Sequence, residues 1–209
     1  MTRRALVPLI ALMGCAAALS AEAQGVSTPR DQQGTRSANG GDSGFVTPEF
    51  YPAPPGLPRG SLSDGVTGLI VRDLSEARDF CIRSPRVEYV IDCLSEEYGR
   101  IAEKMPRGDY EAAKSAVAEA ARGLGALAGA NADPRLPRAR LKRPGGAATP
   151  PLTPVRSTAV NRLNAAAAEI VEEAETVLLR AAERSDRRRA HYQRIAAAIG
   201  STKVLLRAL

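Results

Sequence analysis

The stretch that decides the fold is PRVEYVIDCLSEEYGRIAEKM, residues 85–105. Its apolar side chains recur at alternating four- and three-residue steps, at Val87, Ile91, Leu94, Tyr98, Ile101 and Met105. This period places them along one face of an α-helix. Proline suits the first turn of a helix, so the stretch predicts a helix that begins at Pro85 and needs partner helices to cover its apolar face.

Comparable apolar stripes lie on both sides of this helix. The upstream stripe consists of Val66, Ile70, Leu74, Ala77 and Cys81. Two glycines weaken its first turn, and Asp73 with Glu76 has the spacing of a capping box, so we expect this helix to begin late. Asp109 is a natural N-cap for the downstream helix, which should end near Gly129. The downstream stripe consists of Tyr110, Ala113, Val117, Ala120, Leu124 and Leu127.

The C-terminal region carries the longest stripe. It consists of Val160, Leu163, Ala167, Ile170, Ala174, Val177 and Ala181. The pattern predicts one helix over residues 157–199, about 63 Å long at 1.5 Å per residue, which its neighbours are too short to cover. We therefore expect self-association through this helix. The continued heptad places Arg184, Arg188 and His191 on the stripe, where the helix either leaves the bundle or bends before a short apolar tail ends at Leu209.

These stripes predict an all-α fold, an antiparallel helical bundle of three to four helices with a disordered N-terminal tail. Alanine supplies much of the apolar content and buries little area, so we expect a thin core. The expected segments are a signal peptide at 1–23, a disordered Pro/Gly/Ser-rich tail at 24–63, three helices at 64–128, a basic Pro/Gly-rich linker at 129–156, and the long helix with its apolar tail at 157–209.

Two of these segments have more than one interpretation. Within the tail, the aromatic patch Phe45–Pro52 is either a plain linker or a docking segment, for a partner or for the protein's own bundle. The linker at 129–156 is long for a connection without structure of its own, so it is either functional or disordered.

The N-terminus has the pattern of a bacterial export signal. Arg3 and Arg4 precede an uncharged, mainly apolar run that ends at Leu19, shorter than the ~20 residues of a membrane-spanning helix. A small-x-small site follows, which predicts cleavage between Ala23 and Gln24 and a periplasmic or secreted protein.

A second interpretation of this run concerns Cys15. Leu12-Met13-Gly14-Cys15 resembles the lipobox of bacterial lipoproteins, although Met13 departs from the usual small or β-branched residue there. The resemblance implies a lipidated Cys15 and an outer-membrane-anchored lipoprotein. Contact with the membrane is expected only in that case.

Cys81 and Cys93 are the two cysteines that follow the expected cleavage site. Two cysteines in an oxidising compartment favour a disulfide. On one continuous helix their Cα atoms would lie ~18 Å apart, beyond the ~7 Å that a disulfide allows, so the chain must fold back near Ser84-Pro85. The cysteines lie at unequal distances from that turn, and we therefore expect the first helix to unwind near Phe80. The alternative is a pair of buried thiols.

The spacing of these cysteines carries one resemblance. Together with Leu94 and Tyr98, the Cys-x11-Cys pair is similar to the N-terminal domain of LprI-type lysozyme inhibitors. The likeness ends within this helix pair, and no function is carried over from it.

Two basic clusters are the candidate binding surfaces. One comprises Arg135, Arg138, Arg140, Lys142 and Arg143, and the other Arg184, Arg187, Arg188, Arg189 and Arg194. They predict either an anion-binding surface, for phospholipid head groups, lipopolysaccharide or an acidic protein, or a solvated loop and helix face. Nucleic acid is not expected, because export removes the chain from it and the clusters lack stacking aromatics.

No catalytic, cofactor or metal site is predicted. His191 is the only histidine, and no carboxylates cluster around it in the sequence. Gly123–Ala128 fits a dinucleotide-binding pattern as text but follows no strand, so it lacks the geometry that the motif needs. We therefore expect a non-enzymatic exported bacterial envelope protein that binds a protein or an anionic envelope component through its basic surface. The alternative is an inhibitor or chaperone-like binder of an envelope hydrolase.

Overall fold

The structure is a computed structural model that describes Tyr51 and residues 60–209. The expected signal peptide, Cys15, the cleavage site at Ala23 and Gln24, and most of the tail at 24–63 lie outside the described residues. Of the aromatic patch, the structure describes Tyr51.

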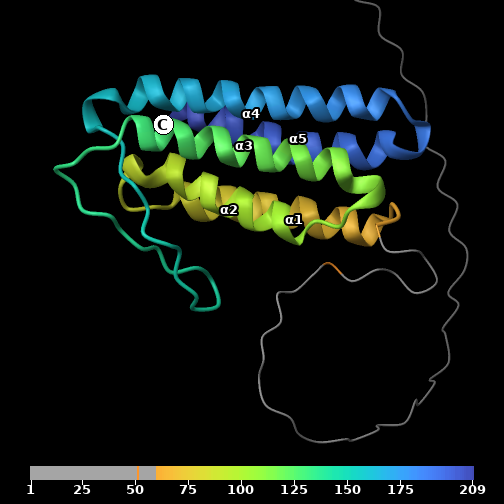
Figure 1. Ribbon diagram of the computed structural model, residues 1–209, viewed down its shortest axis with the longest axis horizontal. Coiled ribbons are helices and arrows are strands. Elements are labelled where there is room, and N and C mark those ends of the chain that lie inside the picture. Colours follow the sequence, from red (N-terminus) through yellow and green to blue (C-terminus); the bar gives the residue numbers. More distant parts are fainter. Residues whose placement is uncertain (1–50, 52–59) are drawn as a thin grey trace, which may run out of the picture. The chain divides into compact units, whose positions relative to one another are not determined.

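Five α-helices form the described part of the chain (Figure 1). They are α1 (Asp64–Ile82), α2 (Val90–Lys104), α3 (Glu111–Ala130), α4 (Val160–Glu183) and α5 (Asp186–Ala208). Short 3₁₀ turns, η1 (Val87–Tyr89), η2 (Gly108–Tyr110) and η3 (Ser157–Ala159), precede α2, α3 and α4. Consecutive helices run antiparallel, and residues 60–209 contain isolated β-bridges but no strand. The all-α antiparallel bundle is confirmed, with one helix more than the upper end of the expected range.

The helices close into a ring. Each helix packs against the next in sequence, and α5 packs back against α1. In a ring of five helices that alternate in direction, one neighbouring pair must be parallel, and here it is α1 and α5. Thr67 lies beside His191 at one end of this pair, and Arg78 lies beside Ser201 farther along both helices. The ring buries the apolar stripe of every helix.

Three tyrosines supply large side chains to a core in which many of the other buried residues are alanines. Tyr98, Tyr110 and Tyr192 are fully buried, and each phenol is hydrogen-bonded. Tyr98 donates to Thr202 Oγ1 at 2.8 Å, and burial raises the pKa of Tyr98 to about 12. The Tyr192 hydroxyl donates to the carbonyl of Asp109 at 2.7 Å. A buried tyrosine is tolerated because its hydroxyl has a partner, so these side chains supply both packing volume and fixed cross-links between helices.

α1 begins earlier than its sequence suggested. Its first residue is Asp64, and Ser63 is the N-cap, with Oγ accepting a hydrogen bond from the Val66 amide at 3.2 Å. The late start expected from Asp73 is therefore wrong. The serine cap satisfies a backbone donor of the first turn, which offsets the weak helix propensity of the glycines there.

α2 and α3 each begin after a 3₁₀ turn, not at the expected residue. Pro85 remains outside α2, which starts at Val90, because the backbone of η1 makes other contacts; the carbonyl of Glu88 accepts a hydrogen bond from the Val155 amide at 2.9 Å. Asp109 lies inside η2 and makes no side-chain cap bond to α3. Both start predictions were therefore wrong by a few residues.

The single long helix expected over residues 157–199 is two helices. The chain turns at Arg184-Ser185, and α5 returns along α4, so the polar interval in the stripe is a turn (Figure 1). α5 continues through Gly200, where a Cβ would lie 2.6 Å from the Glu175 carboxylate; the glycine permits close packing and does not break the helix. The seam of α4 is covered within the chain, which removes the reason for expecting self-association through it.

Asn164 in α4 is the exception in an otherwise satisfied interior. Its side chain is 2% exposed, and neither its Nδ2 nor its Oδ1 has a hydrogen-bond partner among the described residues. We expect Asn164→Ala to raise the free energy of unfolding by about 1 kcal/mol, because it removes a desolvated amide. Asn161→Ala is the matched control, since this exposed residue of α4 undergoes the same change in helix propensity. Urea unfolding of both variants measures the difference; a less stable Asn164→Ala would contradict the expectation.

Candidate functional site

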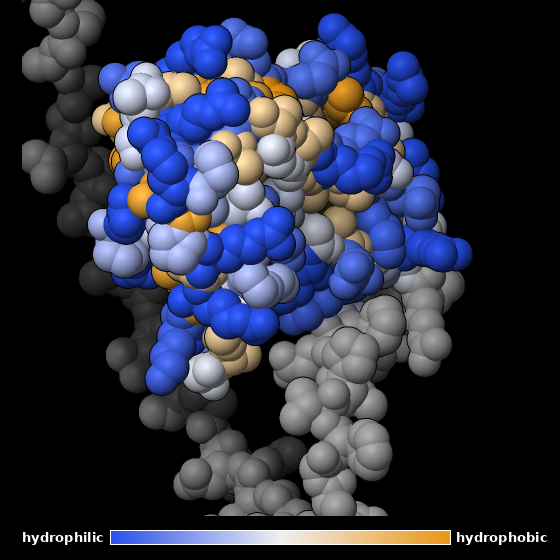
Figure 2. All heavy atoms as spheres, turned by 60° about the vertical axis from the view of Figure 1, so that its left-hand side comes forward, coloured by the Kyte–Doolittle hydropathy of each residue, from blue (hydrophilic) through white to orange (hydrophobic). Residues whose placement is uncertain are grey.

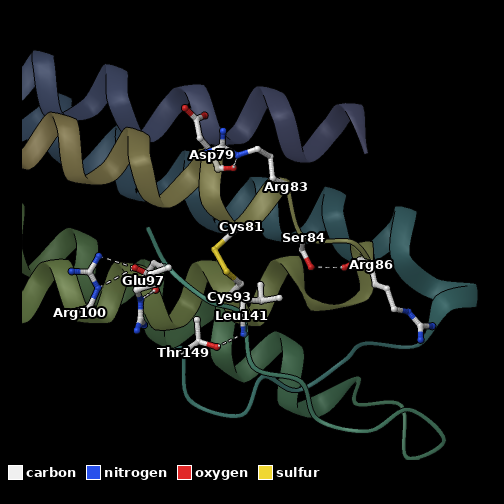
Figure 3. Close-up of a disulfide and its surroundings, with 11 residues drawn as sticks. Asp79, Cys81, Arg83, Ser84, Arg86, Cys93, Glu97, Arg100, Leu141 and Thr149 are labelled. Carbon is white, nitrogen blue, oxygen red and sulfur yellow. Dashed lines mark hydrogen bonds and ion pairs between the residues drawn. A yellow bond between two sulfur atoms is a disulfide. The ribbon is translucent and has the colours of Figure 1, made fainter. Parts of the chain in front are cut away.

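A disulfide joins α1 to α2. Cys81 and Cys93 are bonded, with Cα atoms 5.6 Å apart and both residues fully buried. Figure 3 shows the bond spanning the gap between the two helices. The predicted pairing is confirmed, but the unwinding near Phe80 is wrong, because α1 continues to Ile82. Because α2 begins at Val90, Cys93 lies in the first turn of α2. The disulfide can therefore form while α1 stays helical through Cys81.

Residues 131–156, here called the basic hairpin, are ordered. Three antiparallel bridges hold its two arms together, at Ala132–Val155, Ala139–Leu152 and Lys142–Ala148. Gly145 and Gly146 form its tip with φ of 93° and 94°, a conformation that L-residues with a side chain rarely adopt. Of the two interpretations of this segment, disorder does not hold.

The basic hairpin is fixed to η1 and α2 by hydrogen bonds. The Thr153 amide donates to Asp92 Oδ2 at 2.6 Å, and the Tyr89 hydroxyl donates to the carbonyl of Pro137 at 2.6 Å. Leu152 and Val155 of the hairpin itself are fully buried. Burial raises the pKa of the Asp92 carboxyl, and the hydrogen bonds from Thr153 oppose this shift. These contacts make the hairpin part of the folded core, not a tether.

Glu97, Arg100 and Arg143 form a buried ion cluster, here called the Glu97 clamp. Arg100 donates to Glu97 Oε2 through Nη2 at 2.7 Å, and Arg143 donates to Oε1 through Nε at 2.6 Å. The side chain of Glu97 is 2% exposed, that of Arg143 18% and that of Arg100 34%. One carboxylate of α2 is thus shared between its own helix and the hairpin (Figure 3). The cluster carries one positive charge in excess.

An open groove of about 900 Å³ lies between α1, α2 and the hairpin. Its lining includes Lys104 from α2, the Glu97 clamp and Tyr51. The Tyr51 hydroxyl donates to Asp73 Oδ2 at 2.7 Å, and burial raises its pKa well above the usual value. Tyr51 is therefore packed on the bundle. For this residue the structure agrees with the interpretation of the aromatic patch as a segment that docks on the protein's own bundle.

The basic hairpin carries a large excess of positive charge. Residues 131–156 include six basic residues and one acidic residue, Asp133, which pairs with Arg135 at 3.0 Å. Arg138, Arg140 and Lys142 are exposed and have no acidic partner among residues 60–209. Figure 2 looks at the end of the bundle that bears the hairpin, where hydrophilic residues cover most of the visible face. Most of the cationic groups of this hairpin are thus open to solvent.

The second basic cluster is largely paired within the protein. Asp109 lies 3.3 Å from Arg188 and 3.6 Å from Arg187, Arg189 pairs with Asp186 at 2.8 Å, and Arg194 pairs with Asp64 at 2.8 Å. Arg184, at the C-cap of α4, has no acidic partner in the described part of the chain. Acidic neighbours offset much of this cluster's charge, so the hairpin is the stronger candidate for an anion site.

His191 has a structural partner. Its Nδ1 lies 2.8 Å from Thr67 Oγ1, which in turn lies 2.8 Å from the Tyr110 hydroxyl. Among the described residues no group of three or more histidine, cysteine, aspartate or glutamate side chains could hold a metal ion. Their helices also include none that is long and apolar enough to cross a membrane.

Sequence reasoning identified the cysteines and the basic residues but missed the roles of the acidic residues that pair with the two basic clusters. Glu97 lies beside the apolar stripe of α2, and its partner Arg143 is 46 residues away, so periodicity alone could not pair them. Its neighbour Arg100, at the i,i+3 position of the same helix, was the local signal. Asp109 appeared as a helix cap, but the structure shows it as the acceptor for two arginines of α5.

The fold and the site define a disulfide-linked five-helix bundle with a basic hairpin clamped to one pair of helices. Comparison with protein-family models, with curated proteins and with solved structures finds no match to this chain.

Proposed function

We propose that this chain is an exported, non-enzymatic bacterial envelope protein that binds a phosphate-bearing, anionic component of the envelope through the basic hairpin. The observation that carries the proposal is the disulfide between Cys81 and Cys93, next to which the hairpin is clamped. Disulfides persist in oxidising compartments such as the bacterial periplasm. This agrees with the export signal expected at residues 1–23.

The charge of the hairpin supports an anionic partner. Its exposed cations, Arg138, Arg140 and Lys142, lie on a segment already ordered by hydrogen bonds to α2. A partner would not have to order this backbone on binding, which lowers the entropic cost of association. Arg143 of the clamp belongs to the hairpin, and the charges of the other two members, Glu97 and Arg100, cancel, so the clamp leaves the net positive charge of the hairpin unchanged.

A binding role is favoured over catalysis because the two α2 carboxylates that hydrogen-bond to the hairpin have structural roles. Asp92 accepts the Thr153 amide, and Glu97 is shared between two arginines. A general acid or base needs a titrating group free to exchange a proton with a substrate. Both of these carboxylates instead hold the hairpin in place.

Vesicle binding tests the proposal. We expect the mature protein to bind vesicles that contain phosphatidylglycerol and not vesicles of phosphatidylcholine alone. Arg138→Gln combined with Arg140→Gln should weaken binding about 30-fold, since each basic residue near an anionic surface contributes ~1 kcal/mol. Co-sedimentation at fixed salt measures the partition, and rising salt should weaken it.

Two matched double variants make this test specific. Arg162→Gln with Arg180→Gln removes the same charge from exposed positions of α4, and binding should change little. Arg184→Gln with Arg187→Gln tests the second basic cluster in the same way. Equal loss in all three variants would show that net charge alone drives binding, and the hairpin site would be abandoned. If the protein does not bind anionic vesicles but binds an acidic envelope protein, the proposed phosphate-bearing partner is wrong.

A further inference from the structure

A second, smaller pocket lies between the α1–α2 turn and the hairpin. It has a volume of about 430 Å³ and is here called the turn pocket. Arg83 lines it from the turn, and Lys142 and Arg143 line it from the hairpin. The residues that line this pocket include three cations and no carboxylate, and two of these cations, Arg83 and Arg143, also line the adjoining mixed-charge groove beside α1 and α2.

Several donors in the turn pocket have no protein acceptor among residues 60–209. Arg83 is exposed, and its Nε donates to the carbonyl of Asp79 at 2.9 Å, which leaves both Nη groups open. Lys142 is exposed and has no ion pair there. Arg143 donates from Nε to Glu97 and from Nη1 to the carbonyl of Ala148, and its Nη2 remains available to donate to a ligand. The pocket therefore offers guanidinium and ammonium donors to a ligand.

The walls of the turn pocket are held in place from both sides. Arg83 follows Cys81 by two residues, so the disulfide fixes the turn to α2. The Glu97 clamp fixes Arg143, and Leu141 packs against the hydrophobic core. The backbone on both sides of the pocket is thus held in place, so an anion that enters the pocket has to order the side chains of Arg83 and Lys142 but not the backbone.

We propose that the turn pocket binds a phosphate ester that carries an apolar substituent. Three cations suit a phosphate, with a charge of about −1.5 to −2 as a monoester, better than a single carboxylate. Phe80, Pro85 and Leu141 supply apolar walls for the organic part of the ester. The volume lies within the usual range of small-molecule sites, roughly 300–1,000 Å³. This assignment deepens the proposed function, on which its physiological meaning rests, by naming the chemical group recognised.

The test uses phenyl phosphate as the probe and the disulfide-intact mature protein. Calorimetric titration should show binding, and amide chemical shifts should change at residues 80–84 and 141–143. Inorganic phosphate, which lacks the apolar part, should bind more weakly, and benzyl alcohol, which lacks the charge, should not bind. Arg83→Gln with Lys142→Gln should weaken binding of phenyl phosphate roughly tenfold or more, because it removes two charge-assisted donors.

The control double variant, Arg162→Gln with Arg180→Gln, should bind phenyl phosphate like the unaltered protein. Circular dichroism and the retained disulfide verify that the pocket variant is folded. Unchanged affinity in Arg83→Gln with Lys142→Gln, or shift changes outside the two segments, would overturn the assignment. Vesicles containing phosphatidic acid distinguish the source: loss of vesicle binding in the pocket variant assigns a lipid head group, and loss of phenyl phosphate binding alone assigns a soluble ester.

These measurements separate the site from the proposed function. Phenyl phosphate binding on the isolated protein requires neither export nor a membrane. If the protein binds anionic vesicles through Arg138 and Arg140 but does not bind phenyl phosphate, the proposed function is supported and the turn-pocket assignment is overturned. The reverse result would keep the pocket and remove the hairpin surface.

Discussion

Glu97→Ala is expected to lower the free energy of unfolding by about 2 to 3 kcal/mol, because two partly exposed arginines lose the buried carboxylate to which both donate hydrogen bonds. Both hydrogen bonds of the clamp are short, with donor–acceptor distances of 2.7 Å from Arg100 and 2.6 Å from Arg143, as expected for charge-assisted pairs. Removal of the carboxylate leaves Arg143, whose side chain is 18% exposed, facing the excess charge of Arg100. Denaturant unfolding monitored by circular dichroism measures the loss.

The matched control for this variant is Glu119→Ala. Glu119 in α3 pairs with Arg122 at 3.7 Å, but its side chain is 64% exposed, so we expect a loss below about 1 kcal/mol. Glu97→Gln should fall between the two, because the amide keeps one acceptor oxygen and loses the charge. Hydrogen exchange should also accelerate at Leu141 and Thr149 in Glu97→Ala if the clamp holds the hairpin. A loss no larger than that of Glu119→Ala would show that the clamp does not stabilise the fold.

Cys81→Ala combined with Cys93→Ala is expected to cost about 3 kcal/mol. The two residues are separated by 12 positions, and a cross-link over a loop of this length reduces the entropy of the unfolded chain by about that amount. Both cysteines are fully buried, so loss of the sulfur atoms adds a packing term of the same sign. Urea unfolding with and without reductant measures it. The unaltered protein should lose comparable stability when reduced, whereas reductant should leave the alanine variant unchanged.

The same cysteines report on the compartment. Protein recovered from cells that express the full chain should begin at Gln24 and should resist thiol alkylation until it is reduced. Mass spectrometry of the intact protein reads both properties at once, and a lipid on Cys15 would appear as added mass on a chain that begins there. Full-length protein that keeps Met1 and has reactive thiols at Cys81 and Cys93 would contradict the export that the proposed function requires.

The helices that the sequence predicted well are those whose stripes are local and uninterrupted. α2 and α3 follow from periodicity, because a repeat of 3.6 residues directs the same face toward the core whatever lies opposite. Their starts were less predictable. Glu88 and Asp109 looked like parts of ordinary helix openings, yet each bonds to a segment distant in the chain, Val155 and the arginines of α5 respectively. Such partners determine where a helix begins but leave no local mark.

The C-terminal half shows the limit of periodicity. The heptad pattern continued through Arg184 and Ser185 predicts one helix whose core-facing stripe becomes polar at these residues. In the structure the same two residues form the tight turn between α4 and α5. The choice between them depends on whether α5 can pack back on α4. Gly200 beside Glu175, and Lys203 paired with Glu175 at 2.8 Å, show that it can. Tertiary packing therefore overrides the local preference for one continuous helix.

The sequence by itself predicted the all-α class and the antiparallel arrangement, and it favoured the pairing of Cys81 with Cys93 over two buried thiols, because periodicity and the geometry of a chain reversal are local properties. The tertiary structure decided which charges matter. It pairs most of the α5 arginines with acids, orders the hairpin through Asp92 and Glu97, and leaves Arg83 and Lys142 of the turn pocket without acidic partners in the described chain. The physical reason is that the effect of a charge depends on its neighbours in space, and here those neighbours are distant in the sequence.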